Sequence, residues 1–183
     1  MTSCEECGYV YEELAVAAIS ETLRNLPHRY REAVAGSDGP DLSVRPTPNT
    51  WSALEYICHV RDVFLVQRER VVLAQVEDVP SFARMYRDER VELCGYDGQS
   101  AAAVLAQVEL ASELCALAFE RIEGPTWGRR FVYNWPAAAE NDLAWLGRHT
   151  VHEGQHHLMD VRQVLGLVRA LEAASVPSPT QAT

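Results

Sequence analysis

The sequence predicts an all-α protein, a four-helix bundle over residues 9–172 that follows a short N-terminal Cys-x-x-Cys arm over residues 1–8. Two observations support this prediction. Apolar residues recur at helical spacing in four long segments that show no internal repeat. A chain of 183 residues is also long enough for one domain with a buried core. Residues 173–183 are expected to form a disordered tail.

The first two helices differ in how clearly they begin. Residues 9–34 carry apolar side chains at helical spacing and predict the first helix. A loop rich in Gly, Asp and Pro follows from Gly36 to Asn49. Ser52 and Glu55 then form the Ser-x-x-Glu pattern of a capping box, so a second helix is expected to begin there and run to about residue 76.

The second half of the chain contains the other two helices. The segment Pro80–Leu93 is ambiguous, with a charged run at Arg87–Arg90 that suits a short helix. Residues 100–122 show clear helical spacing and predict the third helix. A loop is expected over residues 124–136, and a long fourth helix over about residues 138–171.

Charge and composition exclude some classes of function. The net charge of −10 argues against binding a nucleic-acid backbone, which requires a positive surface. All sixteen basic residues are arginine, so the chain has no lysine amine for Schiff-base or pyridoxal-phosphate chemistry. The same bias is typical of a GC-rich genome and indicates an actinobacterial source.

The sequence shows no sign of a membrane span or an export signal. No apolar run reaches the roughly 18 residues of a span, and the first residues lack the basic and apolar regions of a signal peptide. Five cysteines, an odd number, favour thiols or metal ligands over a disulfide framework. We therefore expect a cytoplasmic protein that does not bind membranes. Separately, an apolar face of the bundle would suit the formation of a homodimer.

Four of the six histidines lie within residues 149–157, inside the fourth helix. Side chains four residues apart on a helix lie on the same face. The run therefore contains two candidate ligand pairs, His152 with His156 and Glu153 with His157. Because imidazole and carboxylate are common ligands of zinc and similar ions, the cluster predicts a metal site.

The apolar residues of the fourth helix indicate which pair faces the core. Winding the sequence at about 100° per residue gathers them on one stripe, which consists of Leu143, Leu146, Val151, Leu158, Val161, Val164, Leu165 and Val168. His157 lies on this stripe and Glu153 at its edge. His149, His152 and His156 project to the opposite side. We therefore expect Glu153 and His157 to face inward.

The outward pair also matches His-Glu-x-x-His, the metal-binding pattern of zincin proteases, over His152–His156. In that pattern the two histidines bind zinc and the glutamate is the general base. The context argues against this reading, because both histidines face away from the apolar stripe, no further motif follows and Gly154 is a poor helix former. A zincin-type protease is the least favoured alternative.

Two motifs resemble those of the DinB/YfiT-like bundle proteins over about residues 9–171. The first resembles the second-helix motif of that family and reads Trp51-Ser-Ala-Leu-Glu55-Tyr-Ile-Cys-His59-Val-Arg-Asp62. The second resembles its last-helix motif and reads Glu153-x-x-x-His157-Leu-x-Asp160-Val161. Most members carry His at the position of Glu153. Members related to mycothiol-dependent maleylpyruvate isomerase carry Glu there, as this chain does.

The resemblance implies a divalent metal ion held by His59, Glu153 and His157 at one end of the bundle. Zinc is the first expectation, with nickel, iron and manganese as alternatives. Three protein ligands leave a coordination position open for water or a thiolate. Glu55 or Asp62, each one turn from His59, is expected to orient its ring.

The resemblance also implies a reaction. Family members include thiol S-transferases and thiol-dependent isomerases, in which the metal lowers the pKa of the thiol. We therefore expect thiol transfer to a small electrophile, or its isomerisation, with mycothiol as the co-substrate of an actinobacterial protein. The alternatives are a hydrolase that uses metal-bound water at the same three ligands and a non-catalytic metal-binding or stress-response protein.

The N-terminal arm suggests a second metal site. Cys4-Glu-Glu-Cys7-Gly8 has the form of a zinc knuckle, in which the glycine lets backbone N–H groups approach the sulfurs. One knuckle supplies two ligands, and the outward pair His152 and His156 supplies two more. We hypothesise a structural Cys2His2 zinc site between the arm and the fourth helix. The alternative is an exposed thiol pair or a redox-active Cys-x-x-Cys.

The remaining candidate residues have simpler expectations. Three cysteines at apolar helical or flanking positions are expected to be buried: Cys58, Cys94 and Cys115. Three residues before the last helix either line the mouth of the site or pack as an ordinary loop: Tyr133, Asn134 and Trp135. Arg87 or Arg90 is a candidate for binding an anionic substrate, within a run that otherwise suits a solvated face.

Overall fold

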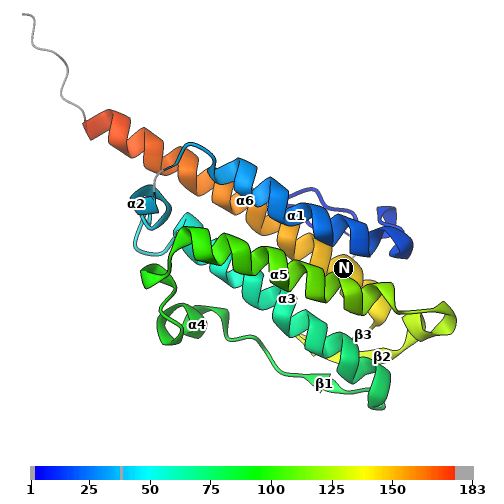
Figure 1. Cartoon of the computed structure of the whole chain (residues 1–183). Coiled ribbons are helices and arrows are strands. Elements are labelled where there is room, and N and C mark those ends of the chain that lie inside the picture. The colour runs from blue at the N-terminus through cyan, green and yellow to red at the C-terminus, as the bar shows by residue number, and fades with distance from the viewer. Residues whose placement is uncertain (1–2, 38, 176–183) are drawn as a thin grey trace, which may run out of the picture.

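A computed structural model describes residues 3–37 and 39–175, and four long helices form its core (Figure 1). They are α1 (Ile19–Val34), α3 (Ala53–Val76), α5 (Ala101–Glu120) and α6 (Leu143–Ser175). Helix α1 packs against α5 and α6, and α3 packs against the same two helices. The predicted four-helix bundle is confirmed. The long helices α1 and α3 follow each other in the sequence but lie at diagonal corners of the bundle.

Helix α6 is the longest element and carries most of the candidate ligands. All eight residues of its predicted apolar stripe are buried in the bundle. The helix continues to Ser175, beyond its predicted end near residue 171. The first three residues of the predicted tail are therefore helical, and residues 176–183 lie outside the described part of the chain.

The start of α3 is set by the predicted capping box. The Ser52 hydroxyl accepts a hydrogen bond from the Glu55 backbone N–H at 3.2 Å, and the Glu55 carboxylate accepts one from the Ser52 N–H at 2.7 Å. The two bonds satisfy backbone donors that a helix start would otherwise leave unpaired. This cap fixes the helix that carries His59.

The predicted first helix begins too early. Its first ten residues are not α-helical: they contain two 3-10 turns, Tyr11–Glu13 and Val16–Ala18, and Val10 pairs with Ser3 in an isolated bridge. Contacts with α6 hold this segment: the Tyr9 hydroxyl donates to the Arg148 carbonyl at 3.1 Å, and the Arg148 guanidinium donates to the Leu14 carbonyl at 2.9 Å. These long-range bonds outweigh the local helical spacing.

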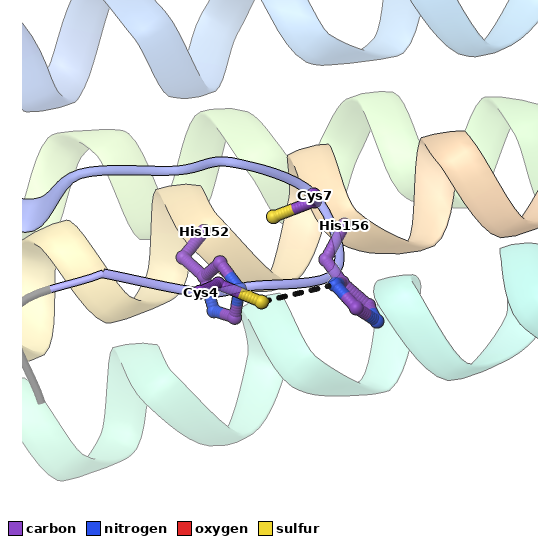
Figure 2. A group of neighbouring side chains, drawn as sticks. All are labelled: Cys4, Cys7, His152 and His156. Atoms are coloured by element: carbon purple, nitrogen blue, oxygen red, sulfur yellow. Dashed lines mark hydrogen bonds between the residues drawn. The ribbon is translucent and has the colours of Figure 1, made fainter.

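The arm before this segment is a tight hairpin over residues 3–10. The Cys4 N–H donates to the Tyr9 carbonyl at 2.8 Å, and the Gly8 N–H donates back to the Cys4 carbonyl at 2.9 Å. Gly8 has a φ of 71°, a conformation that glycine adopts without steric cost. The hairpin lies along α6 and covers the helix face that was expected to point outward (Figure 2).

A small sheet replaces part of the predicted loop and the predicted start of the fourth helix. Its order is β1 (Ser81–Phe82), β2 (Arg130–Asn134), β3 (Ala138–Asp142), with β1 parallel and β3 antiparallel to β2. Helix α6 begins only after Asp142, whose side chain accepts a hydrogen bond from the Trp145 N–H at 2.8 Å. The alanines of β3 favour a helix locally, but pairing with β2 prevails.

Short elements occupy the other connections. Helix α4 (Arg87–Leu93) confirms the short helix expected in the charged run, and α2 (Gly39–Leu42) lies in the predicted loop after α1. Two further 3-10 turns span Tyr96–Gly98 and Gly124–Gly128. Helices α3 and α5 are thus joined by a long connection that passes β1 and α4 (Figure 1).

Among the described helices, only α5 is long and apolar enough to cross a membrane by length and composition, with a mean hydropathy of 1.6. The same helix packs against α1 and α3 in the bundle. Such apolar composition is also typical of a helix in a protein core.

Candidate metal centre

His59, Glu153 and His157 meet in the interior of the bundle. His59 comes from α3 and the other two from α6, and one ligand atom of each lies within 4.8 Å of the others. The ring centroids of the two histidines are 4.9 Å apart, and His157 Nε2 lies 3.6 Å from Glu153 Oε2. The three residues that the family resemblance implied are therefore brought together. We call this group the inner cluster.

The surroundings of His59 suit a metal ligand. The side chain is buried, and its Nδ1 has no hydrogen-bond partner. A buried polar atom left without a partner costs about 1–3 kcal/mol, which a bound group would remove. Burial, with a smaller contribution from His157, lowers the pKa of His59 to about 3, so the ring is neutral as metal ligation requires.

His157 is oriented by a neighbouring carboxylate. Its Nδ1 lies 2.8 Å from Asp160 Oδ2, which leaves Nε2 facing Glu153. Burial alone would lower the pKa of His157, but the hydrogen bond to Asp160 and the nearby charge of Glu153 outweigh it and raise the pKa to about 9. A carboxylate on the far ring nitrogen is the usual partner of a metal-binding histidine.

Glu153 lies between three histidines of its own helix. Its Oε2 faces His157, whereas its Oε1 lies 3.7 Å from His149 Nε2 and 3.6 Å from His152 Nδ1. Burial alone would raise the pKa of Glu153. The charge interaction with His149 and the closeness of His152 and His157 reverse this effect and hold the pKa well below its usual value. Glu153 is therefore a carboxylate anion ready for a cation.

Neither carboxylate that was expected to orient His59 does so. Glu55 serves the capping box and also accepts hydrogen bonds from Arg45 at 2.6 and 2.8 Å. Asp62 accepts a hydrogen bond from the Tyr96 hydroxyl at 2.6 Å. Both carboxylates stabilise the start and packing of α3, so this prediction is wrong. Asp160 on α6 has the orienting role instead, toward the other histidine.

The expectation that His149 and His152 point outward is also wrong, because both are buried. The Tyr11 hydroxyl lies 2.9 Å from His149 Nδ1 and 3.2 Å from His152 Nδ1. The His149 ring also stacks on Trp145, with centroids 4.5 Å apart, and meets Tyr133 edge-on. Helical winding places the residues correctly around α6 but does not reveal that the N-terminal segment and the sheet cover this side.

Gly154, the third position of the His-Glu-x-x-His match, has a packing role. A Cβ there would lie 2.5 Å from Leu26 Cδ1 and 3.2 Å from Phe64 Cζ, both on buried side chains. The glycine lets α6 approach α1 and α3 closely. Gly154, which lies within the protease-like pattern, is thus explained by the packing of the bundle.

Cys4, Cys7, His152 and His156 form a second group, in which one ligand atom of each residue lies within 4.8 Å of the others. Figure 2 shows the two thiols of the arm beside the two imidazoles of α6. Cys4 Sγ lies 3.7 Å from His156 Nδ1. The structure thus brings together the four residues that the sequence singled out. We call this group the outer cluster.

Sequence reasoning missed three residues that shape these clusters: Tyr11, His149 and Asp160. Asp160 lies in the family motif, three residues after His157, and this spacing was a usable signal. Tyr11 gave no signal, because its contacts with His149 and His152 join residues more than 130 positions apart. Two smaller groups, His149/His152/Glu153 and His156/His157/Asp160, share members with the two clusters.

The remaining candidates lie in varied places. Cys58 and Cys115 are buried as predicted, but Cys94 is exposed, because it follows the end of α4. Tyr133 packs in the core, and the Asn134 side chain donates to Ser81 and Phe82 within the sheet.

An aromatic ring and an arginine lie near His59. Arg87 sits over the rings of Trp51 and Trp135, 6.0 and 5.4 Å from their centroids. Trp51 in turn meets the His59 ring edge-on at 5.4 Å. Arg90 instead bonds the Met85 carbonyl and Asp62. Of the two arginines, Arg87 is thus the one placed beside the inner cluster.

Comparison with known proteins places this geometry in context. A family model described as the DinB superfamily matches residues 22–161. The fold is similar to that of YfiT from Bacillus subtilis, with a TM-score of 0.73 over 86% of this chain and 87% of that chain, at 16% sequence identity. YfiT is described as a probable metal-dependent hydrolase with an unusual four-helix bundle topology. No curated protein sequence matches the chain.

Proposed function

The chain belongs to the DinB superfamily, and on this basis we propose that it is a metal-dependent enzyme that transfers a low-molecular-weight thiol to a small electrophile or uses the thiol in its isomerisation. The ligands are His59, Glu153 and His157. The proposed thiol is mycothiol, because Glu153 stands where relatives of mycothiol-dependent maleylpyruvate isomerase carry glutamate. The observation that carries the proposal is the inner cluster, whose ligand atoms lie within 4.8 Å of one another.

The donor set fits a divalent ion such as zinc, which takes imidazole and carboxylate ligands and leaves a position open when only three are present. When bound, the ion would lower the pKa of a thiol and favour the thiolate nucleophile. His59 contributes a neutral ring held by Trp51. Glu153 contributes a negative charge, and Asp160 keeps the His157 ring in position.

The substrate side of the centre is supported by Arg87. Its guanidinium lies over two tryptophan rings, and its nearest carboxylate, Asp88, is 3.9 Å from Nε. The side chain is about half exposed, at 50%. We propose that Arg87 binds an anionic group of the thiol or the electrophile, while Trp51 and Trp135 contact its apolar part.

The carboxylates near the centre are engaged with other partners. Hydrolysis at this centre would be assisted by a general base close to the attacking water. Among the described residues, the carboxylates that the sequence places near the centre already have partners: Glu55 binds Arg45, Asp62 binds Tyr96 and Asp160 binds His157. A bound metal ion would lower the pKa of a thiol and of a water alike, so neither reaction depends on these carboxylates as a base.

Metal-dependent hydrolysis is the second candidate, supported by the description of YfiT and by the same three ligands. A non-catalytic metal-binding or stress-response role would use the inner cluster without turnover. A zincin-type protease finds no support in the geometry, because Cys4 and Cys7 close the face of His152 and His156 where a peptide would have to bind.

The test is a matched pair of assays on the zinc-loaded full chain. One follows loss of the mycothiol thiol in the presence of an activated chloroarene, and the other follows hydrolysis of an activated ester without thiol. We expect turnover only in the first. Removing a ligand forfeits several kcal/mol of catalysis, so His59→Ala should lower kcat/KM by more than about a hundredfold. Cys94→Ser, a change at an exposed thiol, is the control. Ester turnover alone, lost in His59→Ala, would favour the hydrolase.

A further inference from the structure

We propose that Cys4, Cys7, His152 and His156 form a structural zinc site that fastens the N-terminal arm to α6. The site is separate from the inner cluster and does not depend on the proposed thiol chemistry. Its four ligands come from two parts of the chain that are about 150 positions apart, and one ligand atom of each lies within 4.8 Å of the others (Figure 2).

The arm holds its two cysteines in a closed turn. The Cys4 N–H donates a hydrogen bond to the Tyr9 carbonyl at 2.8 Å, and the Gly8 N–H donates one to the Cys4 carbonyl at 2.9 Å. The left-handed conformation of Gly8 closes the turn that permits these contacts. Zinc binds the thiolate form of cysteine, and this turn brings both sulfurs into one group with the imidazoles of α6.

His156 presents one ring nitrogen to a cysteine of the arm and has carboxylates at the other. Its Nδ1 lies 3.7 Å from Cys4 Sγ, whereas Nε2 lies 3.4 Å from Glu6 and 3.7 Å from Asp160. Carboxylates on the far nitrogen fix the tautomer in which the near nitrogen is free to bind metal. The ring is thus oriented as a ligand of the outer cluster.

His152 shows the same division between its two ring nitrogens. Its Nδ1 faces the Tyr11 hydroxyl at 3.2 Å, whereas Nε2 is buried and has no hydrogen-bond partner. Leaving this nitrogen unpaired costs about 1–3 kcal/mol, and a zinc ion would remove that penalty. This unpaired nitrogen is an observation independent of the Cys-x-x-Cys spacing, and it indicates a ligand in this place.

The spacing of the group also suits zinc. With Zn–S near 2.3 Å and Zn–N near 2.0–2.1 Å, tetrahedral geometry separates sulfur from nitrogen by about 3.6 Å. The Cys4 Sγ–His156 Nδ1 separation of 3.7 Å is close to this value. Two thiolates and two imidazoles complete a tetrahedral shell with no open position, which is the pattern of structural rather than catalytic zinc.

A redox-active or simply exposed cysteine pair explains less of the geometry. Such a pair requires neither two imidazoles nor carboxylates on their far nitrogens. Zinc also gives the arm a reason to remain on α6, since its hairpin is short and half-exposed. A hairpin of this size is marginal by itself in water.

The test uses the full chain, purified without a His-tag and under reducing conditions. Zinc content is measured for the parent, for Cys4→Ser/Cys7→Ser and for Cys94→Ser, which removes an exposed thiol outside the cluster. We expect the double variant to lose about one zinc ion per chain and the control to lose none. With Co²⁺ in place of zinc, thiolate-to-cobalt charge-transfer absorption should appear in the parent and in His59→Ala but be absent from the double variant.

Alkylation supplies a readout that is independent of folding in the variants. In the parent, Cys94 should react at once, whereas Cys4 and Cys7 should react only after a chelator removes the metal. Equal zinc content in the parent and the double variant, or no thiolate-to-cobalt band in the parent, would overturn the proposal. A Cys4–Cys7 disulfide in the parent as purified under reducing conditions, with no zinc bound, would also overturn it, in favour of the redox pair.

Discussion

Asp160 Oδ2 lies 2.8 Å from His157 Nδ1, and the same oxygen lies 3.7 Å from His156 Nε2. One carboxylate therefore contacts a histidine of the inner cluster and a histidine of the outer cluster. Glu153 forms a second link, because its Oε2 faces His157 and its Oε1 faces His152. These two carboxylates, both on α6, thus connect the two clusters. We expect an arm held on α6 by zinc to help keep Asp160 and Glu153, and through them His157, in position.

Removing the carboxylate of Asp160 is expected to weaken metal binding without unfolding the bundle. Asp160→Asn keeps the size of the side chain but removes the charge that orients His157. Loss of such a partner typically lowers metal affinity about 10–100-fold. Competition with a chromogenic chelator measures the affinity. Asp78→Asn, at an exposed carboxylate, is the control. An unchanged affinity in Asp160→Asn would show that Asp160 does not position the ligand.

Metal affinity of the inner cluster should rise with pH. Without metal, His157 has a pKa of about 9 and carries a proton at neutral pH, which a metal ion must displace. His59 has a pKa of about 3 and is already neutral, so it adds no further proton. Affinity should therefore increase about tenfold per pH unit until the pH approaches about 9, and then level off.

Isothermal titration in two buffers of different ionisation enthalpy checks this prediction by counting released protons. About one proton per inner ion is expected near neutral pH. Measuring in the Cys4→Ser/Cys7→Ser background isolates the inner cluster. Binding that releases no proton would mean that His157 is neutral before the metal arrives.

Gly154→Ala should destabilise the protein because the added methyl group enters a packed contact. The new Cβ would lie 2.5 Å from Leu26 Cδ1 and 3.2 Å from Phe64 Cζ, so these buried side chains would have to shift. Overpacking of this kind costs about 1–3 kcal/mol. Gly166→Ala is the matched control on the same helix, where no atom lies within 4 Å, and should stabilise by up to about 1 kcal/mol. Urea denaturation compares the two variants, and equal stability would refute the packing role.

Tyr11→Phe should lower stability by about 1–3 kcal/mol, because it leaves buried ring nitrogens of His149 and His152 without the hydroxyl that faces them. Tyr86→Phe, at a side chain that is 59% exposed, is the control and should have little effect. Thermal unfolding of the metal-free proteins provides the comparison. Identical midpoints would mean that water replaces the hydroxyl at no cost.

Much of the fold follows from local patterns in the sequence. The capping box at Ser52 and Glu55 and the apolar stripe of α6 predicted the helices that carry the inner ligands. The start of α1 was wrong because contacts with Arg148 hold the preceding segment, and sequence spacing contains no information about them. The start of α6 was placed too early, although Asp142 is a favourable N-cap residue and gave a usable signal.

The candidate sites were predicted where ligands recur four residues apart on one helix, as in Glu153 with His157 and His152 with His156. Pairing them with His59 or with the arm required a family motif and a zinc-knuckle pattern. The prediction that Glu55 or Asp62 orients the His59 ring was wrong, because these carboxylates bind Arg45 and Tyr96, which come from other segments of the chain. A helical pattern places a residue around its axis, but the elements that cover it depend on the whole fold.

The most direct test of the inner metal centre is the metal content of the untagged protein, compared with that of His157→Ala and His156→Ala. We expect each variant to lose a different ion, so that His157→Ala keeps the thiolate-to-cobalt absorption after cobalt loading and His156→Ala loses it. Retention of every ion in His157→Ala would contradict the inner centre and the chemistry proposed for it.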